Sequence, residues 1–345
     1  MTGALLSALL TARLLASEPG IAGLQVKFDR IVKASRAEIG LSLIHIESGA
    51  RISIRGDQRF PMASVYKLPI AIELLSQIGE GRLTVDRAVP VGASDIRACC
   101  TLSRHHPRGG VTLTAGQLLE LMITESDNTA GDAILKLVGG PAVVERRMRA
   151  LGFEAINVNR YEGLIAFEMN GITQPPPESE WTLELQRRLF DEVNPQALRA
   201  GRARYTREDP RDTATADAMA ALLVRLHRGE LLPKTGTDWL LQLMARVKTG
   251  PRRLKGLLPP DTIVAHKTGT TDVVSHDVGI ITLPPDSAIG GHVVLAVFVT
   301  NGRPALMQQT IAQLSGAAFE YFTGKPLPKP QKPKAPPNKR TRRKG

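Results

Sequence analysis

The sequence predicts a mixed α/β (α+β) fold, with one lobe built from both ends of the chain and a helical lobe inserted between them. Near the N-terminus, the alternating segments GLSLIHIE and ARISIRG are separated by Ser48-Gly49, a pattern typical of a β-hairpin. From Ser64 to about Arg228 the apolar periodicity is mainly helical. Strand-like runs return near the end, in TIVAHK, DVGIITL and HVVLAVFVT. Strands at both ends around a helical middle predict a sheet-containing lobe completed by both termini.

The first and last helices of this plan follow from apolar spacing. A helix over about residues 24–35 places Leu24, Phe28 and Ile31 on one side, and a last helix is expected from about Met307 to Tyr321. We divide the chain into a sheet-containing lobe and a helical lobe that share one domain over residues 19–323. The sheet-containing lobe is expected at about 19–62 and 236–323, and the helical lobe at about 63–235.

An irregular stretch at about residues 167–210 stands out within the helical lobe. It contains Pro175–Pro177, the amphipathic segment SEWTLELQRRLFDEV and then an Arg-rich turn. A connection this long inside a compact domain is usually functional or disordered. We expect an insert with one helix around 179–193 whose apolar residues pack inward, namely Trp181, Leu185, Leu189 and Phe190. Whether the insert shapes the cleft, covers it or packs outside it is left open by the sequence.

Charge is concentrated at the C-terminal end of the chain. The formal net charge is +12, but the last 22 residues hold nine Lys or Arg and no acidic residue, which leaves +3 for the remainder. The folded body therefore shows no sign of a nucleic-acid binder. The Pro- and Lys-rich segment 324–345 is expected to be disordered. It is either a solubilising tail or a tether to anionic cell-envelope polymer or lipid.

The N-terminal segment bears on the compartment, whereas the two cysteines give no indication of it. Residues 1–18 are apolar and rich in small residues like the core of an export signal, although a basic start is missing and Arg13 interrupts them. We expect a signal or anchor remnant and a periplasmic or secreted protein; an ordinary first helix is the alternative. Cys99 and Cys100 are neighbours, which rarely form an unstrained bridge, so no disulfide is expected.

The first candidate for chemistry is Ser64-Val65-Tyr66-Lys67 at the start of a helix. The i, i+3 spacing places the hydroxyl and the amine on one face. Apolar neighbours would desolvate Lys67 and lower its pKa, which makes a neutral amine available as a base. A Ser-x-x-Lys pattern is common by chance, so alone it is equally compatible with an ordinary helix start and a solvated lysine.

A second candidate is Ser126-Asp127-Asn128, a polar triplet between two apolar helical runs. Such a triplet makes a tight turn that exposes its side chains. All three residue types also cap helices well, so a purely structural helix cap is the alternative interpretation.

The third candidate is Lys-Thr-Gly, which occurs three times. The copies at Lys234 and Lys248 lie at the start and the end of a predicted helix, and we interpret them as helix-end signals. Only Lys267-Thr268-Gly269 follows a strand-like run and precedes another strand. On a strand edge, Gly269 lets a ligand approach the backbone closely. We therefore choose the third copy.

Together and in this order, the three motifs resemble the penicillin-binding and class A β-lactamase family. The stretch RRLKGLLPPDTIVAHKTGTTDVVSHDVGIITLP is similar to the PER-like branch of class A, and the resemblance covers about residues 24–322 apart from the insert. It implies a β-lactamase/D,D-peptidase-like fold, with an antiparallel sheet flanked by helices plus an all-helical lobe. It implies a serine hydrolase that opens β-lactams through an acyl-enzyme. A D,D-peptidase or esterase with slow deacylation, and a non-catalytic cell-wall or partner-binding protein, are the alternatives.

The resemblance also implies a role for each motif residue. Ser64 attacks the carbonyl, Lys67 is the base or proton relay, and Ser126 passes a proton to the leaving nitrogen. Backbone N–H groups of Ser64 and Thr270 form the oxyanion hole. Residues of the substrate-binding set hold the amide and carboxylate of the substrate; they are Asn128, Lys267, Thr268, Gly269 and Thr270.

Deacylation in this family uses a glutamate that activates water. The segment Arg160-Tyr161-Glu162 resembles the family's pattern, so Glu162 is the expected general base, with a surface carboxylate as the alternative. The asparagine that helps hold the water is replaced by Ala166, and a competing interpretation uses Glu168 and Asn170. We expect Arg160 to pair with Asp212 across the neck of the loop.

No cofactor or metal is expected, because the seven histidines show no metal-ligand spacing. His266 precedes the chosen lysine on the alternate strand face and is expected to pack rather than react. The expected partners are a small β-lactam or a peptidoglycan peptide, with no nucleic acid, and we expect a monomer.

Overall fold

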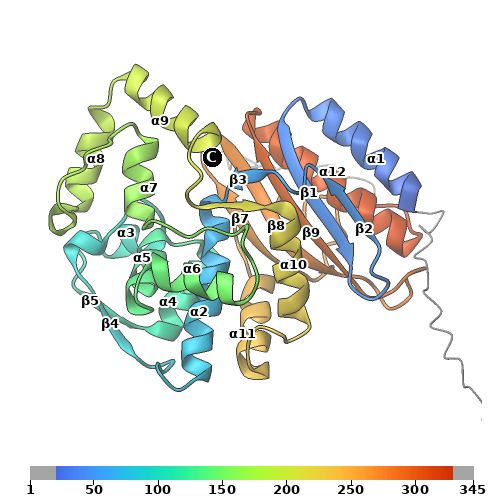
Figure 1. The fold of residues 1–345 in the computed structure, drawn as a ribbon, viewed down its shortest axis with the longest axis horizontal. Coiled ribbons are helices and arrows are strands. Elements are labelled where there is room, and N and C mark those ends of the chain that lie inside the picture. The colour runs from blue at the N-terminus through green and yellow to red at the C-terminus, as the bar shows by residue number, and fades with distance from the viewer. Residues whose placement is uncertain (1–20, 329–345) are drawn as a thin grey trace, which may run out of the picture.

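The computed structural model describes residues 21–328, which fold around a five-stranded antiparallel sheet of order β2-β1-β9-β8-β7 (Figure 1). The N-terminal strand β1 pairs with the C-terminal strand β9 along its whole length, so both ends of the chain complete one sheet. This confirms the predicted fold class. The strands are β1 (Glu38–His45), β2 (Arg51–Ile54), β7 (Val264–Thr270), β8 (Val274–Thr282) and β9 (His292–Thr300).

Strand β9 shows why this sheet lies in the centre of its lobe. Its run HVVLAVFVT sends Leu295, Val297 and Val299 into a core beneath α1 (Ile21–Ser35) and α12 (Pro304–Thr323). The alternate residues Val294, Ala296 and Phe298 enter a second core on the other face, where α10 (Ala216–His227) packs. Successive side chains of a strand point to opposite faces, so a continuously apolar strand is buried on both.

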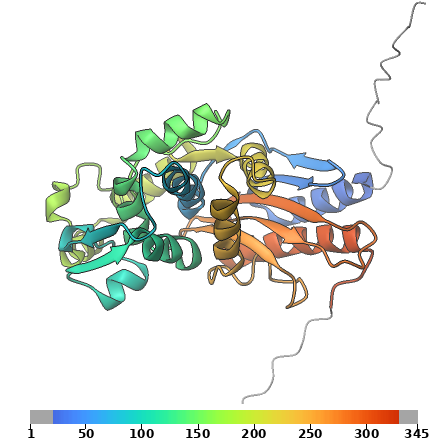
Figure 2. The same cartoon turned by 90° about the horizontal axis from the view of Figure 1, so that it is seen from below.

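The helical lobe is built around α2 (Lys67–Gly79), whose residues from Lys67 to Gln77 are all buried. A helix that is apolar on every side belongs in the interior of a bundle. Figure 2 shows this lobe beside the sheet-containing lobe rather than stacked on it. The other helices of this lobe are α3 (Cys100–His105), α4 (Ala115–Glu120), α5 (Asn128–Leu137), α6 (Pro141–Ala150), α7 (Glu162–Met169), α8 (Leu183–Asp191) and α9 (Pro195–Arg207).

Four short strands were not predicted from the sequence, whereas the helical runs after about residue 215 are confirmed as α10 and α11 (Lys234–Ala245). Two antiparallel pairs, β3 (Arg59–Pro61) with β6 (Thr213–Thr215) and β4 (Ala88–Val91) with β5 (Val111–Thr114), are too short to show a clear alternation. Helices α10 and α11 pack on sheet strands, α10 on β1 and β9 and α11 on β7. The boundary proposed between the two lobes stays a prediction.

The insert contains two helices where one was expected. Trp181 is buried as predicted, whereas Leu185, Leu189 and Phe190 are half-buried. Helix α9 replaces the expected Arg-rich turn: Asn194 caps its N-terminus by accepting a hydrogen bond from the Ala197 N–H at 2.8 Å. Its polar composition hid the helix, because periodicity methods depend on an apolar stripe.

Cys99 and Cys100 form a disulfide, which corrects the expectation that neighbouring cysteines stay unpaired. Cys100 has φ of +78°, a backbone conformation that residues other than glycine rarely adopt. The predicted N-terminal signal and most of the predicted tail lie outside the described residues. Within residues 21–328, no helix is both long and apolar enough to cross a membrane.

Candidate active site

Ser64 lies in a 3-10 turn, Ala63–Tyr66, that leads directly into α2. The preceding residue, Ala63, has φ of +44°, an unfavourable conformation for a residue with a side chain. Such strain is concentrated at functional sites. It sets Ser64 at the wall of a cavity while Lys67 points into the protein.

The Lys67 amine is buried and lies 3.1 Å from the Ser64 hydroxyl. Its Nζ also donates to the Ser126 carbonyl at 2.7 Å and to Asn128 Oδ1 at 2.6 Å. Burial lowers the pKa of Lys67, although the negative charges of Glu162, Asp127 and Asp132 partly offset this effect. The amine can therefore release a proton more readily than a solvated lysine.

The triplet Ser126-Asp127-Asn128 combines a site and a helix cap. Ser126 has φ of +60°, and this turn directs Ser126 and Asn128 toward Lys67. Asp127 is buried; it caps α5 by accepting from the Ala130 N–H at 2.9 Å and also accepts from the Leu102 N–H at 2.8 Å. The capping interpretation applies to Asp127 alone.

Lys267 reaches the same cluster from strand β7. Its buried Nζ donates to Ser126 Oγ at 2.8 Å and to the Thr268 carbonyl at 3.0 Å. Burial, with the positive charge of Lys67 adding to it, holds the pKa of Lys267 well below its usual value. Gly269 lets strand β7 lie close to the segment that precedes Ser64, because a Cβ at this position would lie 2.6 Å from the Met62 carbonyl oxygen.

Arg253 is a buried cation beside strand β7. None of the three sequence motifs contains this residue. It donates to Thr270 Oγ1 at 2.7 Å and to the carbonyls of Gly269 and His276 at 3.1 and 2.8 Å. The guanidinium thus fixes both the backbone and the hydroxyl at the end of β7. Arg253 lies in the stretch that is similar to the PER-like branch of class A, but only the fold shows that it contacts Thr270.

Glu162 is the first residue of α7 and faces the Lys67 cluster from the opposite side. Its Oε1 accepts from Asn128 Nδ2 at 3.0 Å, while Asn128 Oδ1 accepts from Lys67. Burial raises the pKa of Glu162, and the nearby Asp132 raises it further against the opposing charge of Lys67. One asparagine amide therefore links the candidate acylation base to the candidate deacylation base.

Asp132 is a second functional residue that sequence reasoning missed. It is buried and accepts from the backbone N–H groups of Glu162 at 2.6 Å and Gly163 at 3.1 Å. Arg97, also buried, balances it through an ion pair of 2.6 Å. The pair fixes the N-terminus of α7 and hence the position of Glu162. In sequence, Asp132 is simply a polar residue within a helix.

The structure separates the competing candidates for the deacylating group. Glu168 pairs with Arg160 and Arg211 and does not line the cavity. Asn170 lines the cavity, but its Nδ2 donates to the Ala166 carbonyl at 2.8 Å. Ala166 lies one turn after Glu162 and also lines the cavity. Among these candidates, Glu162 alone bonds to the Lys67 cluster.

The predicted ion pair at the neck of the loop is confirmed. Arg160 Nε lies 2.6 Å from Asp212 Oδ2, and both residues are buried. Arg160 also contacts Asp209 at 2.9 Å and Glu168. These contacts close the loop where β6 rejoins the body, with the insert between them.

A cavity of about 340 Å³ lies over this cluster and answers the question about the insert. Ser64, Asn128, Glu162 and Thr270 contribute to its wall, and so does the insert. The insert therefore shapes the cleft. The insert residues that line the cavity are Met169, Asn170, Gln186, Phe190 and Tyr205.

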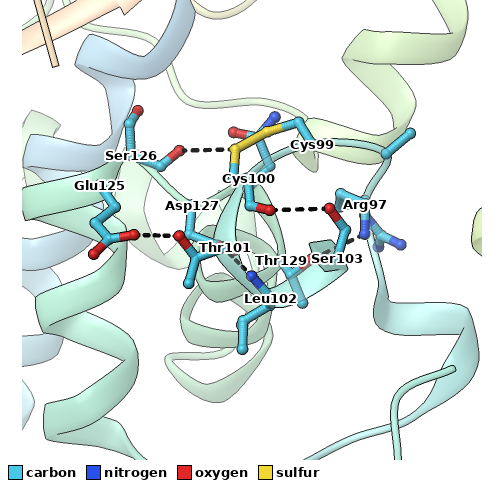
Figure 3. Close-up of a disulfide and its surroundings, with 12 residues drawn as sticks. Arg97, Cys99, Cys100, Thr101, Leu102, Ser103, Glu125, Ser126, Asp127 and Thr129 are labelled. Carbon is cyan, nitrogen blue, oxygen red and sulfur yellow. Dashed lines mark hydrogen bonds between the residues drawn. A yellow bond between two sulfur atoms is a disulfide. The ribbon is translucent and has the colours of Figure 1, made fainter. Parts of the chain in front are cut away.

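The disulfide forms part of the rim of this cavity. Figure 3 shows Cys99 and Cys100 beside the Ser126 turn, with Cys100 Sγ 3.8 Å from the Ser126 carbonyl oxygen. Cys99 itself lines the cavity. On the other side of the same turn, Thr101 hydrogen-bonds to Glu125 (Figure 3).

The two Lys-Thr-Gly copies that were set aside have different surroundings. Lys234 is exposed and pairs with Asp238 at 2.6 Å one helical turn later. The copy at 248–250 borders the site: its Thr249 hydroxyl lies 2.5 Å from that of Thr268. Lys248 itself points outward to Glu125.

The site combines three features: a serine beside a buried lysine, a second serine between two lysines, and a strand that presents a threonine to the cavity. Together they define an acyl-transfer site of the serine hydrolase class. Comparison with known proteins agrees. The family described as "Beta-lactamase enzyme family" matches residues 23–322, and the chain belongs to this family.

Relatives and solved structures extend the match over most of the chain. Beta-lactamase VEB-1 of Pseudomonas aeruginosa is 29% identical, covering 88% of this chain and 91% of that protein. Extended-spectrum beta-lactamase PER-1 of the same organism is 26% identical, covering 86% and 87%. The crystal structure of TLA-1 extended-spectrum beta-lactamase superposes with a TM-score of 0.70 at 27% identity, covering 88% of this chain and 99% of TLA-1.

Proposed function

We propose that this protein is a class A serine β-lactamase that hydrolyses β-lactams through an acyl-enzyme on Ser64. The observation that carries the proposal is the hydrogen-bonded path from Ser64 through Lys67 and Asn128 to Glu162. This path joins a nucleophile to two buried ionisable groups, one for each half of a hydrolysis that proceeds through a covalent intermediate.

In the acylation step, Lys67 accepts the proton of the Ser64 hydroxyl as its oxygen attacks the lactam carbonyl. The 3.1 Å separation supports this transfer. The N–H groups of Ser64 and Thr270 stabilise the oxyanion. When the C–N bond breaks, Ser126 gives its proton to the leaving nitrogen, and the Lys67 amine returns the proton to Ser126, whose Oγ lies 3.5 Å away.

Substrate binding is assigned to the end of β7. β-Lactams and peptidoglycan peptides carry a carboxylate, and Lys267, Thr268 and Thr270 offer a positive charge and two hydroxyls to it. Arg253 adds a second buried cation and holds Thr270 in place. Gly269 keeps the strand close to the turn that carries Ser64. Asn128 remains available to the substrate amide through its Nδ2.

Deacylation is assigned to Glu162. Its carboxylate would take a proton from a water molecule as that water attacks the ester carbonyl, and Ser64 would leave with its proton restored. The side-chain amide that usually helps to hold this water is absent at Ala166. This departure favours the second candidate function, a D,D-peptidase or esterase that acylates at Ser64 and deacylates β-lactams slowly.

A two-part assay separates these functions. Turnover of the chromogenic cephalosporin nitrocefin is compared with retention of a fluorescent penicillin on the protein. A β-lactamase turns over nitrocefin rapidly, loses both signals in Ser64→Ala, and accumulates the penicilloyl adduct in Glu162→Gln. A long-lived adduct on the unmodified protein with little turnover would support the peptidase. Absence of both signals from the unmodified protein would support a non-catalytic protein and reject both enzymes.

For location and assembly we infer a monomeric protein of the periplasm or the extracellular space, where its substrates are encountered, with the basic tail in contact with anionic envelope polymers. The family assignment supports this location. Cell fractionation tests the compartment, light scattering tests the monomer, and deletion of 329–345 tests the envelope contact. Recovery in the cytoplasm, a dimeric mass, or unchanged envelope binding after deletion would each reject one part.

A further inference from the structure

Three potential metal ligands from distant parts of the sequence meet outside the catalytic cavity. Glu47 lies in the turn after β1, His227 is the last residue of α10, and His292 is the first residue of β9. One carboxylate oxygen and one ring nitrogen from each histidine all lie within 4.8 Å of one another. The sequence separations, 180 positions from Glu47 to His227 and 65 from there to His292, explain why no ligand spacing was visible.

Hydrogen bonds already orient the carboxylate toward the rings. Glu47 lies 2.7 Å from His292 Nδ1 through Oε1 and accepts from the His292 backbone N–H at 2.8 Å through Oε2. The His227 and His292 rings lie 4.2 Å apart between centroids. Gly291 makes room for the carboxylate, because a Cβ there would lie 2.2 Å from Glu47 Oε2.

The surroundings hold the ligands in place. His45 is buried, and its Nε2 lies 3.5 Å from Glu47 Oε2 and 2.8 Å from the Gly290 carbonyl. Arg228 donates to the Ile46 carbonyl at 3.3 Å and so ties the end of α10 to the turn that carries Glu47. Groups that orient metal ligands from outside the coordination sphere are a general property of metal sites.

The ionisation states also suit a cation. Burial and the neighbouring His292 lower the pKa of His227, which favours the neutral imidazole that binds metals. Burial raises the pKa of Glu47, but its hydrogen bonds to His292 outweigh this and keep it lowered. Both shifts are in the direction of the forms that bind a cation, the imidazole of His227 and the carboxylate of Glu47.

Strand register places this group far from the chemistry. His292 pairs with Thr282 at one end of β9, whereas Thr270 pairs with Ser275, which pairs with Val299 near the other end. At about 3.3 Å per residue, the seven positions from His292 to Val299 span roughly 23 Å. None of the three ligands lines the catalytic cavity.

We propose that Glu47, His227 and His292 bind one divalent transition-metal ion, and that zinc is the ion this ligand set favours. Two imidazoles and a carboxylate with a water molecule as fourth ligand satisfy tetrahedral zinc. Zinc–ligand bonds of about 2.0–2.2 Å require the three ligand atoms to lie closer to one another than they do in this structure. Small rotations of the half-exposed side chains would bring them to these distances. The ion would connect the end of α10 to the sheet at β1 and β9, so its role would be structural.

The test uses the full-length protein after treatment with a chelator, titrated with zinc chloride in a calorimeter and followed by thermal unfolding. One equivalent of zinc is expected to bind, and zinc at about 100 times Kd should raise Tm by several degrees. His227→Gln and His292→Gln should each weaken binding at least tenfold, and cobalt should give the absorption of a tetrahedral site that both variants lose.

Controls separate the site from adventitious binding and from misfolding. The double variant His105→Gln/His106→Gln, which removes the chain's adjacent histidine pair, should keep the full zinc affinity. Each variant should keep the metal-free Tm of the parent within a few degrees and the parent's nitrocefin rate. Failure of the parent to bind one equivalent, or equal binding by the parent and both folded ligand variants, would overturn the proposal. Neither outcome bears on the assignment of Ser64.

Discussion

Burial changes the pKa of Lys67 and Glu162 in opposite directions. It lowers that of the amine and raises that of the carboxyl, so both shifts favour the uncharged forms. Asn128 connects the two groups through its amide. Proton transfer between Lys67 and Glu162 therefore costs less free energy than the pKa values of the two solvated groups would require.

The first prediction concerns the pH dependence of hydrolysis. Glu162 must be ionised to act as a base, and its pKa lies above the ordinary value of 4.5. Turnover should therefore fall as the pH drops through a midpoint above 4.5, while acylation continues and the acyl-enzyme accumulates. Glu162→Gln should slow deacylation about 10²- to 10⁴-fold. The measurement is kcat from pH 4 to 8 with mass spectrometry of the adduct.

Two outcomes would contradict this assignment. One is a midpoint at or below 4.5, and the other is an unchanged kcat in Glu162→Gln. The matched control is Glu168→Gln, a carboxylate of the same loop that contacts Arg160 and Arg211 and does not line the cavity. It should lower stability and leave the pH midpoint in place.

A second prediction tests the electrostatic role of Lys267. A charge-assisted hydrogen bond contributes about 1.5–3 kcal/mol, so Lys267→Ala should lower kcat/KM for an anionic β-lactam about 10- to 150-fold. Lys248→Ala is the matched control, because that exposed lysine belongs to a neighbouring Lys-Thr-Gly and pairs with Glu125 rather than with the site. Steady-state kinetics of both variants decide the matter, and equal losses would refute the specific role.

At the scale of elements, α7 and the insert form one unit with the catalytic loop. Trp181 is buried against Phe167 of α7, with ring centroids 4.9 Å apart, and under the Arg97 guanidinium at 5.2 Å from its ring. Arg97 in turn pairs with Asp132, which holds the backbone of Glu162. Packing in the insert is therefore connected to the position of Glu162, the proposed general base.

This connection predicts an uneven effect of Trp181→Ala. Truncating a buried tryptophan costs about 3–5 kcal/mol of unfolding free energy. Because the change loosens the Arg97–Asp132 pair, deacylation should slow more than acylation, with more acyl-enzyme at steady state. Trp239→Ala on α11 is the control: it should lower stability without raising the adduct. Pre-steady-state kinetics with urea unfolding would reject the connection if both variants behaved alike.

At the scale of the whole molecule, the sheet buries ionisable groups that make stability depend on pH. His276 of β8 is fully buried, and its Nδ1 accepts from the Val299 N–H at 3.0 Å. Burial lowers its pKa from 6.5 to about 3, with the nearby Arg253 contributing. At pH values between about 3 and 6.5, His276 is therefore protonated in the unfolded chain and neutral in the folded chain.

The contribution of His276 to the free energy of unfolding should therefore be at its maximum above pH 6.5 and should fall as the pH drops toward 3. From pH 6.5 to 5, this residue alone should cost up to about 2 kcal/mol. His276→Asn keeps an acceptor for Val299 and should flatten the pH slope of the urea unfolding free energy. The exposed His105→Asn should not flatten it, and parallel slopes for all three proteins would contradict the assignment.

Much of the site could be predicted from sequence because its motifs are local. Ser64 with Lys67, and Ser126 with Asn128, are separated by only two or three positions, and the structure brings both pairs together with Lys267. Asp132 and Arg253 could not be found this way. Their roles depend on hydrogen bonds to residues 16 to 31 positions away, and no local pattern records such contacts.

By itself, the sequence determined the sheet strands, the main helices and the placement of Ser64 beside Lys67, because apolar periodicity and short motifs act over a few neighbouring residues. Only the tertiary structure decided the second insert helix, the Cys99–Cys100 bridge and the place of the insert at the cavity wall. It also decided the pKa shifts and the meeting of Glu47 with His227 and His292. These properties depend on burial and on distances between remote segments, which folding sets and local sequence does not contain.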